Sequence, residues 1–436
     1  MCYKTSSSRW ERTINYNPTT TIRIAPPLKL EANAVFKELG ITMSTAVNAF
    51  LAAVVRTGRI PFDLEISQPS TSGHNRPSSS DLPRNAALNR AFRAKKDEFY
   101  TQYEDVDKEL AHYPGQFNGK HVLCNCDDPF ESAFFRYFLL HFDELGLASL
   151  TSTCYSSSPV AGQEYQLETG QWPYIAVVTR TPDGDLILPD DSLDLETVFD
   201  MEGNEISWLE GDGDFRSAEC VDLLKEADIV VTNPPFSLFR EYMAQLVEHN
   251  KKFLILGNMN AATYREVFPL FRDNKVWYGV SIRSGDRKFH VPDSYPLGAS
   301  NCGIDESGRR FIRVKGVRWF TNLDNARRHE ELILTRKFNP SDYPRFDNYD
   351  AIEVSRTMDI PADYDGLIGV PITYLDRYNP SQFEIVMLAN GNARTNVTAE
   401  TLSAVGYVPD PGDKGGVGMI DGQRSYARIL VRRVAA

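Results

Sequence analysis

An apolar strand that runs directly into two prolines constrains the fold of this chain more than any other feature of the sequence. The segment Ala227-Asp-Ile-Val-Val-Thr-Asn-Pro-Pro-Phe236 begins with a β-branched run that is typical of a strand buried on both faces. Proline has no N–H to donate, so the β-ladder ends at the prolines and the backbone beyond the strand is rigid. Such strands belong to parallel sheets covered by helices, and these sheets bind ligands at the carboxyl ends of their strands.

Other apolar segments alternate with helical stretches and predict an α/β fold with a mostly parallel, Rossmann-like sheet. We expect a helix at 131–145 and, around a Pro-Asp-Gly turn, an inserted hairpin of Ile175–Thr179 and Leu186–Leu188. The expected core strands span residues 122–126, 150–155, 206–209, 229–232 and 253–256.

The chain divides at a stretch rich in serine and proline, residues 68–80, which is typical of a flexible linker. A length of 436 residues also favours more than one domain. The predicted parts are an N-terminal tail (1–17), a small module (18–66), a linker (67–84), a catalytic domain (85–322) and a C-terminal α+β recognition region (323–436).

The small module follows the order strand, helix, helix. Residues 19–24 alternate polar and apolar side chains, and two amphipathic stretches after them end at Gly40 and Gly58. A unit of this size cannot bury its own apolar faces, so we expect it to form a homodimer.

The module resembles the ribbon-helix-helix antitoxins of the RelB/DinJ family through Leu39-Gly-Ile-Thr-Met-Ser-Thr-Ala-Val-Asn-Ala-Phe50 and Arg59-Ile-Pro-Phe-Asp63. The resemblance implies a paired ribbon in the DNA major groove, with Thr19, Thr21 and Arg23 facing the base edges. A toxin protein is a further candidate partner. The alternative is a dimerisation module that no longer reads DNA.

The composition is that of a folded protein, with 42% hydrophobic residues and no apolar run of the roughly 20 residues that cross a bilayer. The polar residues 1–12 do not read as a secretory signal, and the six cysteines are scattered without zinc spacing. We therefore expect a cytoplasmic protein with no membrane partner and no metal. The net charge of −12 argues against nucleic acid, but Lys275–Arg336 holds twelve basic and seven acidic residues, a local charge of +5.

The residues that follow the apolar strand suit the capture of a planar amine. The side-chain oxygen of Asn233 and the carbonyl of Pro234 can accept its two hydrogens. Pro235 keeps the backbone rigid, and Phe236 offers a ring on which a base can stack. Asn-Pro-Pro followed by an aromatic residue is typical of amino-methyltransferases acting on adenine, cytosine or glutamine amides. The alternative is a strand-to-helix turn without a catalytic role.

The methyl donor should bind upstream in the same sheet, yet no glycine-rich loop follows the first strand. The segment Cys124-Asn-Cys-Asp-Asp-Pro-Phe-Glu-Ser-Ala-Phe-Phe-Arg-Tyr137 instead predicts a strand, an acidic turn and a helix. After the third strand, Gly211-Asp-Gly-Asp-Phe215 offers Asp214 as an acceptor for the donor's adenine amine and Phe215 as a packing face. A glycine-rich acidic turn is the alternative for this loop.

From about Asn85 to the C-terminus, the chain resembles the EcoRI-type DNA adenine methyltransferase family. The matching segments are Ala94–Gln102, Cys124–Tyr137, Arg318-Trp-Phe-Thr-Asn-Leu-Asp324, Arg328-His-Glu-Glu-Leu-Ile-Leu334 and Gly369-Val-Pro-Ile-Thr-Tyr-Leu-Asp376. The resemblance implies S-adenosylmethionine as the donor, held by a degenerate loop that lacks the usual glycines.

By the same resemblance, Tyr100 and Thr101 contact the methionine end of the donor. The backbone of Asp127, Asp128 and Pro129 lies beside it, and one of the two carboxylates receives the ammonium group. Cys154 stands where an acidic residue normally holds the ribose. The alternative for the two acidic residues is a helix N-cap pair.

The sequence therefore predicts an enzyme that flips an adenine out of double-stranded DNA and methylates its N6. The basic stretch Ser284–His290, together with Arg283 just before it, supplies the best candidates for DNA contact: Arg283, Arg287 and Lys288. Two alternatives remain open. One is an RNA or protein-glutamine methyltransferase, which the same motif would serve. The other is a catalytically silent antitoxin or repressor that only binds DNA.

Overall fold

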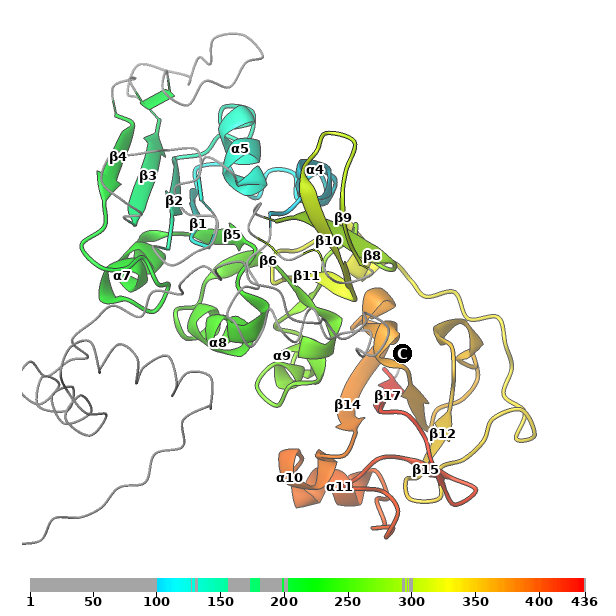
Figure 1. Cartoon of the computed structure of the whole chain (residues 1–436). Coiled ribbons are helices and arrows are strands. Elements are labelled where there is room, and N and C mark those ends of the chain that lie inside the picture. Colours follow the sequence, from blue (N-terminus) through cyan, green and yellow to red (C-terminus); the bar gives the residue numbers. More distant parts are fainter. Residues whose placement is uncertain are drawn as a thin grey trace, which may run out of the picture. The chain divides into compact units, whose positions relative to one another are not determined.

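The computed structural model describes residues 100–434 with internal gaps (Figure 1). The gaps are residues 127, 130–131, 156–172, 181–197, 200–202, 292–294, 296 and 298–300. The predicted N-terminal module, with Thr19, Thr21 and Arg23, lies outside the described residues, as does the linker. The chain separates into two compact units, residues 1–77 and 78–436.

An eight-stranded sheet in the order β4-β3-β2-β1-β5-β6-β11-β7 forms the centre of the second unit. The strands are β1 (His121–Cys124), β2 (Ser149–Thr153), β3 (Tyr174–Thr179), β4 (Glu205–Trp208), β5 (Ile229–Thr232), β6 (Lys252–Asn258), β7 (Trp277–Tyr278) and β11 (Val317–Thr321). The four central strands β2, β1, β5 and β6 run parallel, whereas every pairing outside them is antiparallel. The sheet is therefore mixed, and the predicted parallel arrangement applies only to its centre.

Two predicted strands take other places than expected. The strand at 206–209 is not a core strand but β4, which lies at the sheet edge with partly exposed side chains. The strand at 175–179 is β3, which pairs antiparallel with both β2 and β4, and the predicted hairpin stays a prediction. Its expected partner, 186–188, lies outside the described residues. Alternation of apolar residues reveals that a strand is half-buried, but not which strands lie beside it.

Helices cover both faces of this sheet (Figure 1). They are α4 (Tyr103–Leu110) and α5 (Ala133–Leu140) on one face, and α7 (Ala218–Glu226), α8 (Phe239–Glu248) and α9 (Phe268–Arg272) on the other. Successive strand residues point to opposite faces, so Val122 joins the core under α5 while Leu123 joins the core under α8. The helix predicted at 131–145 is shorter in the structure. It begins where the Ser132 hydroxyl accepts the N–H groups of Phe134 and Phe135.

Two smaller sheets complete the described chain. An antiparallel sheet of β8 (Asp286–His290), β10 (Arg310–Lys315) and β9 (Cys302–Ile304) adds its apolar side chains to the core under α4 and α5. The C-terminal sheet has the order β12-β13-β17-β14, and the apolar residues of one face join the core under α8 and α9, whereas those of the other face form a separate cluster. Its strands are β12 (Ala351–Glu353), β13 (Leu367–Val370), β14 (Phe383–Ala389) and β17 (Arg428–Arg433).

Short elements connect these layers. They are the 3-10 turns η1 (Phe236–Leu238), η2 (Met259–Thr263), η3 (Ala326–His329), η4 (Thr357–Asp359) and η5 (Ile372–Arg377), the helices α10 (Ala393–Asn396) and α11 (Ala399–Ala404), and the hairpin of β15 (Met419–Ile420) and β16 (Gln423–Arg424). Among the described helices, none has the length and apolar character to cross a membrane. The boundary between a catalytic and a recognition region at residues 322 and 323 stays a prediction.

Candidate active site

The Asn-Pro-Pro-Phe motif lies at the carboxyl end of β5, in the middle of the large sheet. β5 ends at Thr232, and Asn233 and the two prolines after it are buried. The backbone stays extended at Pro235 and turns at Phe236 into η1, which leads into α8. Phe236 is 5% exposed and belongs to the apolar core on the α5 face. The motif thus stands at a strand end, as the sequence predicts, and the roles of its residues stay predictions.

Asn125 lies at the same edge of the sheet, directly after the neighbouring strand β1. The register pairs Leu123 with Val230, which places Asn125 beside the end of β5. The Tyr242 hydroxyl of α8 donates a hydrogen bond to the Asn125 Oδ1 atom, and burial raises the pKa of Tyr242 well above its usual value. The Asn125 Nδ2 group is buried and makes no hydrogen bond within the described chain. Asn125 is not among the residues predicted from the sequence, although its position directly after a central strand indicates a place at the edge of the sheet.

Asp128 is a buried carboxylate, 3% exposed, that faces the ends of β2 and β3. The Tyr174 hydroxyl donates to its Oδ1 atom at 2.8 Å, and the Cys154 thiol lies 3.5 Å from its Oδ2 atom. Burial, and then the nearby Asp128, raises the pKa of Tyr174, so this hydroxyl remains a donor. Asp128 does not cap α5 with its side chain, because Ser132 does so. Asp127 lies outside the described residues, and Pro129 is buried beside Asp128.

Tyr100 approaches the same place from the start of the described chain, and Thr101 follows it in the sequence. The backbone N–H and C=O of Tyr100 pair with those of His290 at the end of β8, at 3.0 and 3.1 Å. Tyr100 is also close enough to Tyr174 to help raise the pKa of that side chain, after the larger effects of burial, Asp128 and Cys154. Thr101 is 7% exposed, and its hydroxyl makes no hydrogen bond to any residue that the structure describes.

The loop at Gly211–Phe215 packs against the end of β2. Gly213 has a φ of +76°, and a Cβ atom there would lie 2.3 Å from the carbonyl oxygen of Cys154, so only glycine fits. The Phe215 ring meets the Tyr242 ring edge-on, with centroids 5.0 Å apart. Both carboxylate oxygens of Asp214 already accept from Arg216, at 2.8 and 2.6 Å. An adenine amine would therefore have to share Asp214 with that guanidinium.

These residues form a polar site at the carboxyl edge of the central strands. The structure brings Asp128 and Cys154 together there, and Phe215 packs against Tyr242, whose hydroxyl donates to Asn125. Buried polar atoms without a hydrogen-bond partner among the described residues include the Thr101 Oγ1, the Asn125 Nδ2 and the Thr153 Oγ1 atoms. Buried polar atoms normally have partners. A ligand with ammonium, carboxylate, hydroxyl and amine groups, such as S-adenosylmethionine, would supply them.

The basic residues predicted to contact DNA differ in their surroundings. Lys288 on β8 forms an ion pair with Asp305 at 2.8 Å. Hydrogen bonds from Lys288, Ser307 and His290 hold the pKa of Asp305 well below its usual range. Arg287 is partly buried and donates to the Ser284 carbonyl at 3.4 Å. Arg283 is exposed, and its Nε group donates to the Val280 carbonyl. Within the described chain, no cluster of three or more His, Cys, Asp or Glu side chains is arranged to hold a metal ion.

Comparisons with known proteins identify relatives of both parts of the chain. Residues 87–434 match the family model described as adenine-specific methyltransferase EcoRI, and residues 17–75 match the RelB antitoxin model. The Type II methyltransferase M.EcoRI of Escherichia coli is 47% identical over 338 residues, 74% of this chain and 94% of the relative. M.MpnI of Mycoplasma pneumoniae is 38% identical over 353 residues, 79% of this chain and 98% of the relative. No solved structure matches the chain.

Proposed function

The chain belongs to the adenine-specific EcoRI methyltransferase family, and from this premise we propose how its own residues carry out the reaction. It is a DNA adenine methyltransferase, and methyltransferases of this kind use S-adenosylmethionine. The single observation that carries the proposal is the position of Asn233 and its prolines at the end of β5, next to the buried polar atoms around Asn125 and Asp128.

The target base has to leave the duplex, because its amine cannot reach a site at a sheet edge while it is stacked. The Asn233 side-chain oxygen and the Pro234 carbonyl then accept the two hydrogens of the N6 amine. Two fixed acceptors direct the nitrogen lone pair away from themselves, toward the donor side of the site. Phe236 contributes the apolar surface against which the base packs.

S-adenosylmethionine, when bound, supplies a methyl group on a positively charged sulfur that is already a good leaving group. The contribution of the chain is therefore orientation more than chemical activation. Neither an amide nor a peptide oxygen is a strong base, so the proton that N6 loses passes to water. The two acceptors hold that N–H group until it does.

We assign the ammonium group of the donor to the Asp128 side chain, whose carboxylate is held in place by Tyr174 and Cys154. Thr101 and Asn125 offer the buried polar atoms that hold the remaining polar groups. Phe215 packs on the adenine ring of the donor. Tyr100 joins this pocket to β8 through its backbone.

The N-terminal segment that matches the RelB antitoxin model is proposed as a homodimer contact that also touches DNA. A toxin protein is the second candidate partner of this segment. The match to the antitoxin model favours both over a role as a simple spacer.

The test is direct. The full chain is incubated with tritium-labelled S-adenosylmethionine and, separately, with duplex DNA, structured RNA and a protein extract, and the modified product is identified by mass spectrometry. N6-methyladenine in DNA alone is the expected result. Label in RNA or in glutamine would overturn the substrate, and no label in any of them would favour a binding protein without catalysis.

A further inference from the structure

A pocket rich in arginine lies between the large sheet and the C-terminal region, outside the donor site. It has a volume of about 310 Å³. Four arginines and one carboxylate contribute to its lining: Arg283, Arg327, Arg356, Arg377 and Asp376. We call it the arginine pocket. The chain as a whole has a net charge of −12, so this local concentration of positive charge favours the binding of an anionic ligand.

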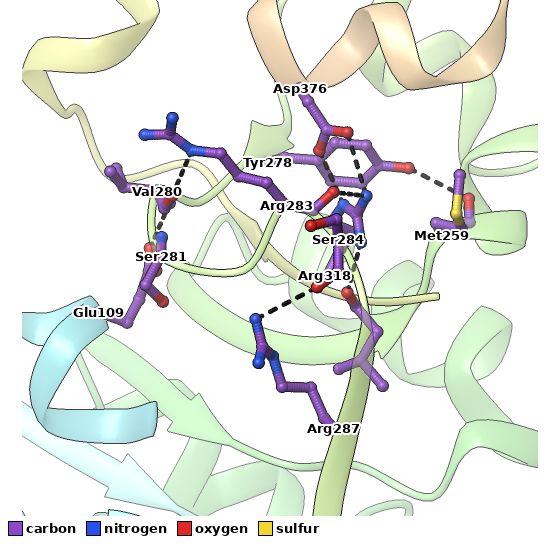
Figure 2. Close-up of polar contacts among 11 residues, drawn as sticks. Glu109, Met259, Tyr278, Val280, Ser281, Arg283, Ser284, Arg287, Arg318 and Asp376 are labelled. Carbon is purple, nitrogen blue, oxygen red and sulfur yellow. Dashed lines mark hydrogen bonds and ion pairs between the residues drawn. The ribbon is translucent and has the colours of Figure 1, made fainter. Parts of the chain in front are cut away.

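The one carboxylate of the pocket is already engaged. Arg318 of β11, whose side chain is 4% exposed, donates to both oxygens of Asp376, at 2.7 and 3.1 Å (Figure 2). Burial raises the pKa of Asp376, and Arg318 acts in the opposite direction by favouring the charged form. The charges of Arg283 and Arg377 also favour the charged form of Asp376, but one carboxylate that is hydrogen-bonded to Arg318 cannot balance the four arginines of the lining.

Arg283 is held in place although its side chain is exposed. Arg318 donates to its carbonyl oxygen, and its own Nε group donates to the Val280 carbonyl at 3.1 Å (Figure 2). The segment before it is fixed by Glu109 of α4, which accepts the backbone N–H groups of Val280 and Ser281 at 2.8 and 2.7 Å. The arginine is thus preorganised, which lowers the entropy lost when it binds a ligand.

Arg327 and Arg377 lack acceptors. The Arg327 Nη1 group is buried and makes no hydrogen bond within the part of the chain that the structure describes. Arg377 is exposed, and its guanidinium makes no hydrogen bond or ion pair to a described residue. Arg356 reaches Asp359 at 3.5 Å and is otherwise exposed. A buried cationic donor without an acceptor is costly, and an anion in the pocket would give the Arg327 Nη1 group the acceptor that the described residues do not supply.

The pocket stands at the same edge of the sheet as the target motif. Arg318 pairs with Gly257 near the carboxyl end of β6, and Thr232, just before Asn233, pairs with Ile255 of the same strand. Only β6 lies between β11 and β5, so these two strands are roughly 10 Å apart, which is two strand spacings.

We infer that the arginine pocket binds phosphodiester groups of the target DNA strand beside the flipped nucleotide. This inference rests on the proposed function. Guanidinium groups suit phosphate because they donate two parallel hydrogen bonds. Contacts of this kind fix the position of the duplex without reading its sequence. The Arg318–Asp376 pair and Glu109 act as positioning residues that hold the pocket together.

The test measures binding of the full chain to a 30-base-pair duplex of arbitrary sequence at several salt concentrations. Arg327→Gln and Arg377→Gln are compared with Arg424→Gln. Arg424 is an exposed arginine of β16 that lies outside the pocket and makes no side-chain hydrogen bond or ion pair to a described residue. Each pocket variant should lower the slope of log K against log salt by about 0.9, and the double variant by about 1.8. Arg424→Gln should leave the slope unchanged.

Binding of S-adenosylmethionine and the unfolding temperature are measured on the same variants, and both should match the unaltered chain. If the unaltered chain methylates DNA but the pocket variants keep its salt slope, the inference is wrong and the proposed function stands. If the variants instead weaken donor binding, the arginines serve the donor carboxylate, and the inference is overturned. If the unaltered chain neither binds nor methylates duplex DNA, the proposed function itself fails.

Discussion

Replacing Asn233 by alanine tests the proposed capture of the amine most sharply. The side chain is 3% exposed, so water has little room to replace the lost oxygen. If Asn233 made only a neutral hydrogen bond to the bound base, its loss would cost about 1 kcal/mol, roughly a fivefold loss of rate. Positive charge builds on N6 during transfer, so the acceptor is worth more in the transition state. Removing one aimed group at a reacting centre typically costs about 2.7–4 kcal/mol, a 10²- to 10³-fold loss.

The assay is single-turnover transfer of labelled methyl to duplex DNA, with the donor and the enzyme in excess. This measures the chemical step without product release. The dissociation constant of the donor is measured by calorimetry on the same protein, and it should stay within about twofold of the unaltered value. Asn233→Asp is the matched control, because it keeps the size and an acceptor oxygen, so its rate should fall less than that of Asn233→Ala.

Two results would refute this reasoning. A rate for Asn233→Ala within about fivefold of the unaltered chain would show that the oxygen is not used in the transition state. An equal loss of rate and of donor affinity would show that the residue holds the donor instead of the base.

Three further predictions follow from the site and the chain organisation. Phe236→Ala should no longer hold a flipped 2-aminopurine at the target position, so the increase in fluorescence on binding should be lost. Phe236→Trp should keep this increase. Equal fluorescence of the two complexes would exclude a stacking role for Phe236. Asp128→Asn should raise the dissociation constant of the donor by about tenfold or more, and Thr101→Val should raise it by about fivefold, as measured by calorimetry. If neither variant changes the affinity for the donor, the donor binds elsewhere. Deleting residues 1–77 should leave a compact, active unit that light scattering finds monomeric, and a persistent dimer would place the contact elsewhere.

The central strands could be predicted because their sequence is decisive by itself. A short β-branched run that ends in two prolines strongly favours a buried strand over a helix. β5 begins and ends at the residues that the sequence predicts. The place of the target motif follows from that strand alone. The position of the 206–209 strand could not be predicted, because it depends on β3, which enters the sheet antiparallel between β2 and β4.

The residues of the proposed donor site differ in how far the sequence indicates them. Thr101, Asp128 and Cys154 follow from the family resemblance, and the structure brings Asp128 and Cys154 into contact. Tyr174 and Tyr242 were missed because each reaches the site from another element, β3 or α8, and a tyrosine in an apolar run reads as a core residue. Only the tertiary structure shows that their hydroxyl groups point at Asp128 and Asn125.

The arginine pocket shows what patterns of charge along a sequence leave out. The local excess of basic residues between Lys275 and Arg336 was a usable signal for Arg283 and Arg327, but Arg356 and Arg377 lie beyond that window. Several basic residues inside the window are neutralised, as Lys288 is by Asp305 and Arg318 is by Asp376. A count of charges along the chain adds paired and unpaired groups alike. Binding of an anion depends on the unpaired ones, and the folded chain decides which arginines those are.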